Sequence, residues 1–221
     1  MDTTISKEDY LKAIAEAESE GEVVIAATVV RWLHVTPAAV TTALRRLRRD
    51  GLVTVKTDGK LKLTKAGREI AERIRFRHHL IERMLNEMFG MEWYKVHEEA
   101  ERLEHAVSSD FEAKLIERLG KNGVCPHGND IRADSPAERR SRGLVTLSEV
   151  EPPDTAVVES VYERDRTLLE YFDKIGIRPA TSLRVLERNP DATLRLMAGG
   201  EAVLLGSAAA ARIWVRLPKE R

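Results

Sequence analysis

The feature that most limits the fold is a basic amphipathic helix followed at once by a short hairpin. The letters TPAAVTTALRRLRRDG predict a helix over residues 37–50, with a threonine N-cap, proline at the first position and glycine after the end. The next letters, LVTVKTDGKLKLT, alternate apolar and polar residues around an Asp-Gly turn and predict two antiparallel strands. Helices are also expected over residues 7–20 and 23–33. This order of elements predicts a winged helix-turn-helix.

The charges of the chain cancel, with 36 basic and 36 acidic side chains, but they are unevenly distributed. Residues 31–68 carry ten basic and two acidic side chains, a net charge of +8. The segments on either side are acidic, with net charges of −5 over residues 1–30 and −4 over residues 69–120. A compact basic segment beside acidic ones indicates one surface for an anion and another for a cation.

The helix over residues 37–50 has the properties of a DNA recognition helix. Its first turns carry small and hydroxylated side chains that allow close approach to base edges, and arginines follow on the exposed side. Basic residues of the hairpin would contact phosphates. The expected DNA-binding residues are Thr36, Ala38, Ala39, Thr41, Thr42, Arg45, Arg46, Arg49, Lys56 and Lys60. The alternative is a winged helix that binds only protein.

Composition excludes several classes of protein. With 43% hydrophobic and 33% charged residues, the chain has enough apolar material for a core and is neither disordered nor fibrous. It contains no apolar run of the ~18 residues that a transmembrane helix needs, and its first residues do not resemble a secretory signal. The single cysteine cannot form an internal disulfide, so we expect a cytoplasmic protein with no membrane partner.

The rest of the chain divides into a helical part and a β part. One long helix is expected over residues 65–89, and one or two more over residues 92–119. Residues 122–143 are rich in Gly, Pro and charge and are predicted to be a linker. From residue 144 short strands dominate, interrupted by one helix over residues 165–175. We therefore expect a mainly α protein with a small β-barrel or sandwich, divided into domains at 1–70, 71–121 and 144–221.

Potential metal ligands lie at helical spacings in the acidic segment. Glu101, Glu104 and His105 share one helix face, and His78 and Glu82 are four residues apart on the preceding helix. His97 lies one turn before Glu101. Imidazole and carboxylate ligands together suit divalent first-row metals, and a carboxylate-rich set favours harder ions such as Mn(II). Alone, His78 and Glu82 would more often be a surface ion pair.

Several segments in the first 130 residues resemble the diphtheria-toxin-repressor family of iron- or manganese-dependent transcriptional repressors. They are SKEDYLKAI, LRRLRRDGLV, RHHLIERML, KVHEEAERLEH and CPHGNDI, in this order and at consistent spacing. The C-terminal part resembles more weakly the Src-homology-like, or FeoA-like, barrel of that family. The resemblance implies that residues 71–121 form a metal-binding and dimerisation domain.

The resemblance implies two metal sites per subunit. The primary site would use Asp9 from the first helix together with the three ligands at 101–105. The ancillary site would use His78, Glu82 and His97 with ligands from the C-terminal domain, for which Glu163 is the first candidate and Asp165 the next.

Two departures from the family pattern bear on the metal. Iron-responsive members have Cys where Glu101 stands and Met where Asp9 stands, and exchange of sulfur for carboxylate favours Mn(II). Binuclear manganese regulators carry a second acidic ligand where this chain has Lys12. We therefore expect a mononuclear primary site and a manganese-responsive protein.

Four other possible ligands receive no metal role. Cys125 and His127 have no spaced partner, and the matching loop of the family is not a ligand. His79 is expected to face away from His78, and His34 to end a helix.

Together these features predict a non-enzymatic repressor of metal homeostasis that binds palindromic operator DNA as a homodimer when loaded with Mn(II). The apolar residues Leu80, Ile81, Met84, Leu85, Met88 and Phe89 are candidates for the dimer face, with packing inside the subunit as the alternative. Alternative interpretations are an Fe(II)-responsive member of the family, a winged-helix regulator without metal, and a carboxylate-rich helical metalloenzyme. The sequence disfavours the metalloenzyme, because that class needs Glu-x-x-His on two helices and no Glu lies three residues before any histidine.

Overall fold

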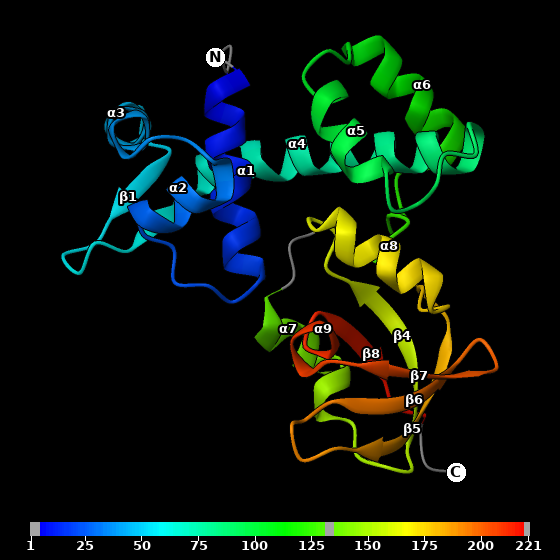
Figure 1. Ribbon diagram of the computed structural model, residues 1–221. Helices are drawn as coiled ribbons and strands as arrows, with labels where there is room; N and C mark the ends of the chain where they lie inside the picture. Colours follow the sequence, from blue (N-terminus) through cyan, green and yellow to red (C-terminus); the bar gives the residue numbers. More distant parts are fainter. Residues whose placement is uncertain (1–4, 131–134, 219–221) are drawn as a thin grey trace.

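The computed structural model of the protein describes residues 5–130 and 135–218 (Figure 1). These residues contain three hydrophobic cores. The first core belongs to the N-terminal unit, for which the sequence predicts DNA binding and which is called the DNA-binding unit below. Its elements are α1 (Ile5–Ser19), α2 (Ala26–Leu33), α3 (Pro37–Arg49), β1 (Val53–Val55) and β2 (Leu61–Leu63). The two strands pair antiparallel and form the wing. The predicted winged helix-turn-helix is confirmed.

Local contacts explain where the helices of this unit begin. The second helix begins at Ala26, later than expected, because the preceding backbone is extended: the Val24 carbonyl accepts a 2.8 Å hydrogen bond from the Leu61 amide of β2. The third helix begins where predicted, and the Thr36 side chain caps it by accepting a 3.2 Å hydrogen bond from the Ala39 amide. The wing is thus tied to the segment that enters α2.

The long helix α4 (Lys65–Arg83) connects this unit to the helical unit and runs without a break through the boundary predicted between residues 70 and 71 (Figure 1). Its first turn packs against the backbone directly before β1, since a Cβ on Gly67 would lie 2.1 Å from the Leu52 carbonyl oxygen. The π-helical turn η1 (Met84–Met88), α5 (Val96–Leu103) and α6 (Ser109–Leu119) follow. Because α1, α5 and α6 all pack on α4, polar residues on several of its sides are buried.

The candidate dimer-face residues separate into two groups. Leu80, Ile81, Met84 and Leu85 are buried in the core of the helical unit, so packing inside the subunit accounts for them. Met88 and Phe89 are exposed, with 71% of Phe89 accessible.

The segment predicted to be a linker is more structured than expected. Val124 and Asp130 form a β-bridge, and α7 (Pro136–Ser141) follows. Cys125 and His127 are fully buried, so this segment contributes polar groups to the interior. Composition did not indicate this, because the turn is stabilised by contacts with distant parts of the chain.

The C-terminal unit is a six-stranded antiparallel sheet in the order β3-β8-β4-β5-β6-β7. The strands are β3 (Leu144–Thr146), β4 (Thr155–Val161), β5 (Ser182–Arg188), β6 (Leu194–Ala198), β7 (Glu201–Leu205) and β8 (Ile213–Arg216). The helices are η2 (Leu147–Glu149), α8 (Arg166–Lys174) and α9 (Ser207–Ala210). Register shifts in β4 and β5 bend the sheet around its core. The prediction of a small β domain is confirmed.

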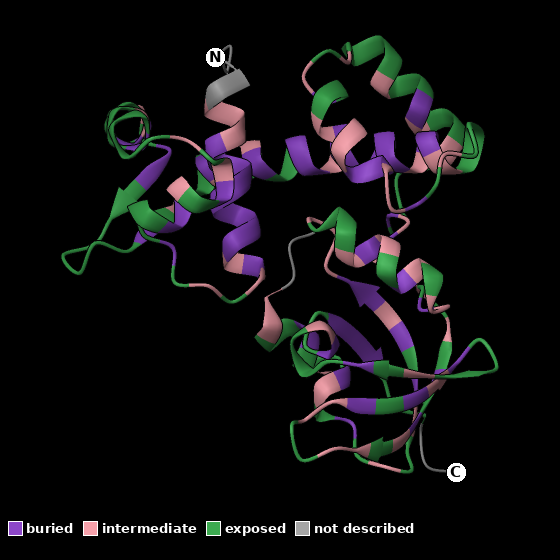
Figure 2. Cartoon of the chain, viewed as in Figure 1, coloured by how far each residue is buried: buried purple, intermediate pink, exposed green. Residues whose placement is uncertain are grey.

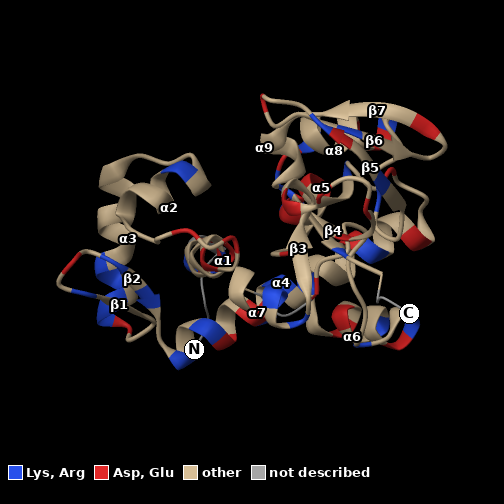
Figure 3. Cartoon of the chain, turned by 90° about the horizontal axis from the view of Figure 1, so that it is seen from below, with Lys and Arg blue, Asp and Glu red and all other residues tan. Residues whose placement is uncertain are grey.

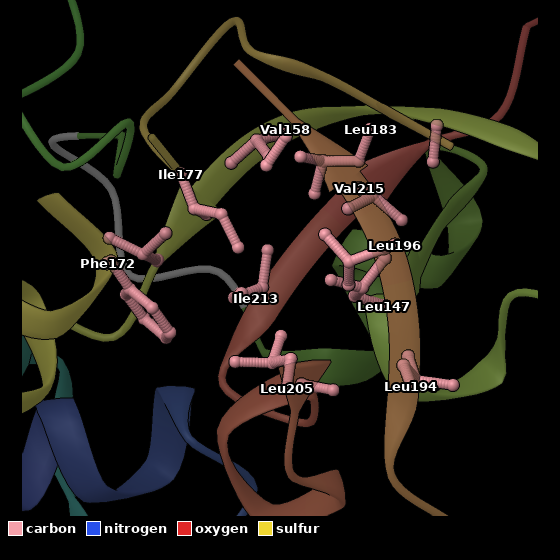
Figure 4. Close-up of a cluster of buried hydrophobic side chains, with 14 of the residues drawn as sticks. Leu147, Val158, Phe172, Ile177, Leu183, Leu194, Leu196, Leu205, Ile213 and Val215 are labelled. Carbon is pink, nitrogen blue, oxygen red and sulfur yellow. The ribbon is translucent and has the colours of Figure 1, made fainter. Parts of the chain in front are cut away.

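Side chains from the strands and from α8 point toward one another inside this unit (Figure 4). Trp93, from the helical unit, joins the same core, and its Nε1 donates a 2.6 Å hydrogen bond to Asp173 of α8. The C-terminal unit is therefore packed onto the helical unit.

Burial follows the inner faces of the helices and strands (Figure 2). None of the helices within residues 5–130 and 135–218 has the length and apolar character needed to cross a bilayer.

Candidate metal centres and DNA interface

Asp9, Glu104 and His105 form a first cluster, here called the α1–α5 centre. Asp9 lies on α1, whereas Glu104 and His105 lie directly after α5, and one ligand atom from each lies within 4.8 Å of the others. His105 Nε2 is 2.7 Å from Asp9 Oδ1, and His105 Nδ1 is 3.0 Å from Glu8 Oε2. The cluster therefore joins the DNA-binding unit to the helical unit.

Lys12 places a positive charge inside this centre. The side chain is 4% exposed, and its Nζ donates hydrogen bonds to both oxygens of Glu104, at 2.8 and 3.0 Å. Burial lowers the pKa of Lys12, but the carboxylates of Glu16 and Glu104 outweigh it, so the pKa lies above its ordinary value. The ammonium therefore stays charged beside Glu104.

Glu101 lies at the edge of the α1–α5 centre rather than inside it. Its Oε1 is 3.2 Å from Arg164 Nη1, 3.5 Å from His97 Nε2 and 4.0 Å from Lys12 Nζ. Burial raises the pKa of Glu101, but His97, Lys12 and Arg164 lower it by a larger amount. The pKa therefore lies well below its ordinary value, and the carboxyl stays ionised. To bind the same metal ion as Asp9, Glu101 would have to give up its ion pair with Arg164.

His78, Glu82 and His97 form a second cluster, here called the buried histidine centre. His78 Nε2 and His97 Nδ1 each lie 3.1 Å from Glu82 Oε1, and they lie 3.0 Å from each other. All three side chains are buried between α4 and α5. The structure thus brings together three residues that their spacing in the sequence assigned to one site, and their role as metal ligands stays a prediction.

The buried histidine centre extends to residues that the sequence analysis set aside. His79, Cys125 and Glu163 offer ligand atoms that lie with Glu82 within 4.8 Å of one another. Cys125 Sγ is 3.3 Å from Glu163 Oε2, and His127 Nδ1 is 3.5 Å from Glu82 Oε1. His79 therefore turns toward the same cluster as His78, contrary to the expectation that it faces away. Cys125 and His127, which have no spaced partner in the sequence, find partners in distant parts of the chain.

The two adjacent histidines both meet polar groups because other parts of the chain enclose α4 at this point. The turn that carries Cys125 packs on β4 through Gly128, which has φ +82°. A Cβ on Gly128 would lie 2.0 Å from the carbonyl oxygen of Glu159 in β4. The adjacent letters Cys-Pro-His-Gly were the only signal in the sequence for Cys125 and His127. Their partner Glu163 lies just after β4, far along the chain, so the sequence did not connect them.

Asp165, the second candidate from the C-terminal domain, lies outside both centres. It is exposed, and its Oδ1 accepts a 2.9 Å hydrogen bond from the Leu168 amide as the N-cap of α8. Its carboxylate caps the helix, and Asp165 is not among the residues of either metal cluster.

Protons compensate the buried carboxylates in the absence of another cation. Burial lowers the pKa of His78 and Lys12 lowers it too, but Glu82 and Glu104 prevail and raise it to about 9. Burial also opposes the charged form of His127, yet Glu82 and Glu163 raise its pKa to about 10. Both imidazoles are thus held as cations at neutral pH.

This chemistry fits a divalent metal ion. Among the residues that the structure describes, Glu82 Oε2 and His79 Nδ1 are buried without a hydrogen-bond partner. Unpaired buried acceptors and imidazole nitrogens are costly, and a cation coordinated by the cluster would satisfy them. The donor set of imidazole, carboxylate and thiol is one that first-row metals accept.

The metal-free protein should lose stability as the pH rises above neutrality. Folding raises the pKa of His78 to about 9 and that of His127 to about 10, above the ordinary value of 6.5. Their contribution to the free energy of unfolding is therefore complete below pH 6.5 and is lost as the pH rises through these two values. Urea unfolding in chelator should therefore show a falling free energy of unfolding between pH 6.5 and pH 9. The variant His127→Gln should reduce this slope, whereas a constant or rising stability would contradict the charge assignment.

The predicted DNA-reading residues lie on one exposed surface of the first unit. The ten predicted positions, from Thr36 at the start of α3 to Lys60 of the wing, are all exposed, while Val40, Leu44 and Leu47 face the core. Figure 3 shows basic residues gathered on the wing beside α3. This geometry allows α3 to enter a groove with the wing against the backbone.

Basic residues on this surface should set the salt dependence of DNA binding. Replacing Arg46 or Lys56 with Ala should weaken binding to all sequences alike and reduce the slope of log affinity against log salt by about one each. Lys114→Ala, an exposed change on α6, serves as the control. Loss of affinity with an unchanged slope would argue against phosphate contacts.

Comparison with known proteins agrees with this geometry. The iron dependent repressor N-terminal DNA binding domain matches residues 2–61, and the iron dependent repressor metal binding and dimerisation domain matches residues 64–133. A FeoA domain matches residues 145–217. The diphtheria toxin repressor of Corynebacterium jeikeium is 31% identical over 203 residues, covering 82% of this chain and 83% of that protein. The chain belongs to the iron-dependent repressor family.

Other members of the iron-dependent repressor family are similar over nearly the whole chain. The iron-dependent repressor IdeR of Mycobacterium leprae is 32% identical, with 93% of each chain covered. A manganese-dependent transcriptional repressor solved with manganese has a TM-score of 0.85 and 33% identity, covering 96% of this chain and 100% of that one. The manganese regulator SloR has a TM-score of 0.76 and 30% identity, covering 96% and 98%. These relatives are regulators, so a helical metalloenzyme is not supported.

Proposed function

We propose that the protein is a Mn(II)-dependent repressor of metal homeostasis, which binds palindromic operator DNA as a homodimer when metal-loaded. The observation that carries this proposal is the meeting of Asp9 with Glu104 and His105. A carboxylate on the first helix of the DNA-binding unit thereby lies against a carboxylate and an imidazole of the helical unit. A divalent ion held there would fix the two units relative to each other.

The α1–α5 centre would hold one ion through Asp9, Glu104 and His105, with Glu101 completing the set after leaving Arg164. Lys12 already neutralises part of the acidic charge beside Glu104. This supports a mononuclear centre, because a second cation would meet the ammonium at close range.

The buried histidine centre would hold a second ion through His78, Glu82 and His97, with Glu163 and Cys125 on its other side. The ion would supply the positive charge that the imidazolium protons otherwise provide. Metal affinity at this centre should accordingly rise with pH, because ligands must lose their protons to coordinate.

The ligand chemistry favours Mn(II) at the α1–α5 centre, where no sulfur is present among the clustered groups. A specific observation supports a second candidate, an Fe(II)-responsive repressor. Cys125 Sγ adjoins the buried histidine centre, and thiolate shifts preference towards softer metals than Mn(II). Metal titration distinguishes the two candidates.

A homodimer would place two recognition helices about 34 Å apart, one turn of DNA. Large hydrophobic side chains remain exposed on the helical unit and support dimerisation there. They are Met88, Phe89, Leu103 and Phe111.

The proposal is tested by selecting DNA from a random pool in the presence of Mn(II) and then titrating the selected sequence. Anisotropy of labelled DNA would be followed with Mn(II), Fe(II), Zn(II) or chelator. We expect binding that appears with Mn(II) and is reversed by chelator. Equal binding in chelator would contradict a metal-dependent repressor, and activation by Fe(II) but not Mn(II) would favour the second candidate.

A further inference from the structure

One arginine of the C-terminal unit reaches both other units. Arg164, between β4 and α8, places Nη1 2.6 Å from Glu16 Oε2 of α1 and 3.2 Å from Glu101 Oε1 of α5. Its guanidinium carbon lies 4.8 Å from the centre of the Trp32 ring, at the end of α2. The side chain is 19% exposed, so these contacts are largely shielded from water.

The contacts with the DNA-binding unit are suited to holding it in place. The Glu16 side chain is 9% exposed, and a shielded carboxylate next to a guanidinium depends on that partner for its charge compensation. Stacking of the guanidinium on Trp32 adds a cation–π contact. Removing Arg164 would therefore loosen α1 and α2 from the C-terminal unit.

Trp32 lies in the last turn of α2, the helix that precedes the recognition helix. Only a short turn through His34, with φ +53°, separates α2 from the Thr36 cap of α3. A shift of Trp32 would therefore reach α3 through this turn.

The residue before Arg164 belongs to the buried histidine centre. Glu163 accepts hydrogen bonds from Asn129 Nδ2, at 2.6 Å, and from Cys125 Sγ, at 3.3 Å. Two consecutive residues thus point to different partners, one to the buried centre and the other to α1 and α2. A change in the position of Glu163 would be transmitted to Arg164 through a single peptide unit.

From this juxtaposition we propose that Arg164 is a positioning residue that couples the buried histidine centre to the recognition helix. It forms a second connection to the DNA-binding unit, independent of Asp9. This inference rests on the proposed function. The assembled α1–α5 centre and the Arg164 contacts occur in the same arrangement of units, so both connections favour the same state.

Metal binding would strengthen this connection in two ways. An ion at the buried histidine centre would fix Glu163, and an ion that takes Glu101 would leave Arg164 to Glu16 and Trp32. Arg164 therefore contributes most when both centres are loaded.

The test uses the full-length protein, saturated with Mn(II), and the selected operator. Arg164→Gln should weaken operator binding about tenfold while the protein still binds the same number of Mn(II) ions. Hydrogen exchange of residues 24–36 should increase in the DNA-free, Mn(II)-loaded variant. Arg166→Gln is the matched control, because Arg166 pairs with Glu98 of α5 and with Glu170. Within the part of the chain that the structure describes, it forms no ion pair with α1 or α2.

A double-mutant cycle separates coupling from a general structural role. Glu163→Gln should weaken operator binding in the wild-type background and have little further effect when Arg164 is already Gln. Additive losses of operator affinity in the double variant would overturn the inference. So would an Arg164→Gln protein whose operator affinity and hydrogen exchange equal those of the wild type. If Arg164→Gln does not fold, the same measurements on Glu16→Gln decide, since it removes the principal ion pair of Arg164 with the DNA-binding unit. Failure of wild-type protein to respond to Mn(II) would instead count against the proposed function.

Discussion

Replacing Asp9 with alanine is expected to abolish most of the Mn(II)-dependent gain in operator affinity, a loss of about a hundredfold if the coupling lies near the upper end of the usual range. Asp9 is the α1 residue whose carboxylate joins Glu104 and His105 in the α1–α5 centre. Without it, a metal ion still meets the other ligands but no longer holds α1. Anisotropy titrations of operator DNA at fixed and saturating Mn(II) measure the effect.

Glu99→Ala is the control for this prediction. Glu99 is an acidic residue of α5 that pairs with Arg102 and belongs to neither cluster. We expect this variant to retain most of the response to Mn(II). Full metal-dependent binding by the Asp9→Ala protein would show that the units are not joined through this centre.

Replacing Lys12 with methionine is expected to destabilise the metal-free protein by about 3 kcal/mol, because removal of one partner of a buried ion pair leaves the other charge less compensated. Glu104 then depends mainly on the His78 imidazole, whose Nδ1 lies 2.6 Å from its Oε2. Glu104 is buried and receives two hydrogen bonds from the ammonium. For a chain of this length, that change corresponds to a fall in Tm of about 10 °C. Mn(II) should then restore more stability than in the wild type, because it no longer meets an ammonium beside Glu104.

Thermal unfolding with chelator and with Mn(II) checks both parts of the Lys12 prediction. Lys7→Met is the control, since Lys7 also lies on α1 and is ion-paired, but with the Asp50 side chain at the end of α3. A Mn(II)-induced rise in Tm smaller than that of the wild type would mean that Lys12 supports the ion at the α1–α5 centre rather than opposing it.

The local elements of the fold were predictable because short-range rules decide them. The Thr-Pro start of α3 and the Asp-Gly turn of the wing each depend on a few adjacent residues. The start of α2 was misplaced because the Val24 carbonyl pairs with β2, a partner that sequence periodicity does not reveal. The order of strands in the C-terminal sheet likewise depends on long-range pairing.

The candidate ligands were predictable to the extent that helical spacing places them together. His78 and Glu82 lie one turn apart on α4, and the structure brings them to His97. Cys125 and His127 were missed because their partners, Glu82 and Glu163, lie far away in the sequence. The resemblance to the family supplied Asp9, which no local pattern connects to His105.

Mn(II) affinity measured with and without operator DNA tests whether an ion at the α1–α5 centre fixes the DNA-binding unit. If it does, linkage requires that operator DNA raise Mn(II) affinity, and the factors for all ions of the DNA-bound dimer multiply to the factor by which saturating Mn(II) raises operator affinity. Equilibrium dialysis with and without the selected operator gives the first factors, and anisotropy titrations with Mn(II) and with chelator give the second. We expect operator DNA to raise Mn(II) affinity well above its DNA-free value, and a Mn(II) affinity unchanged by operator DNA would contradict the coupling.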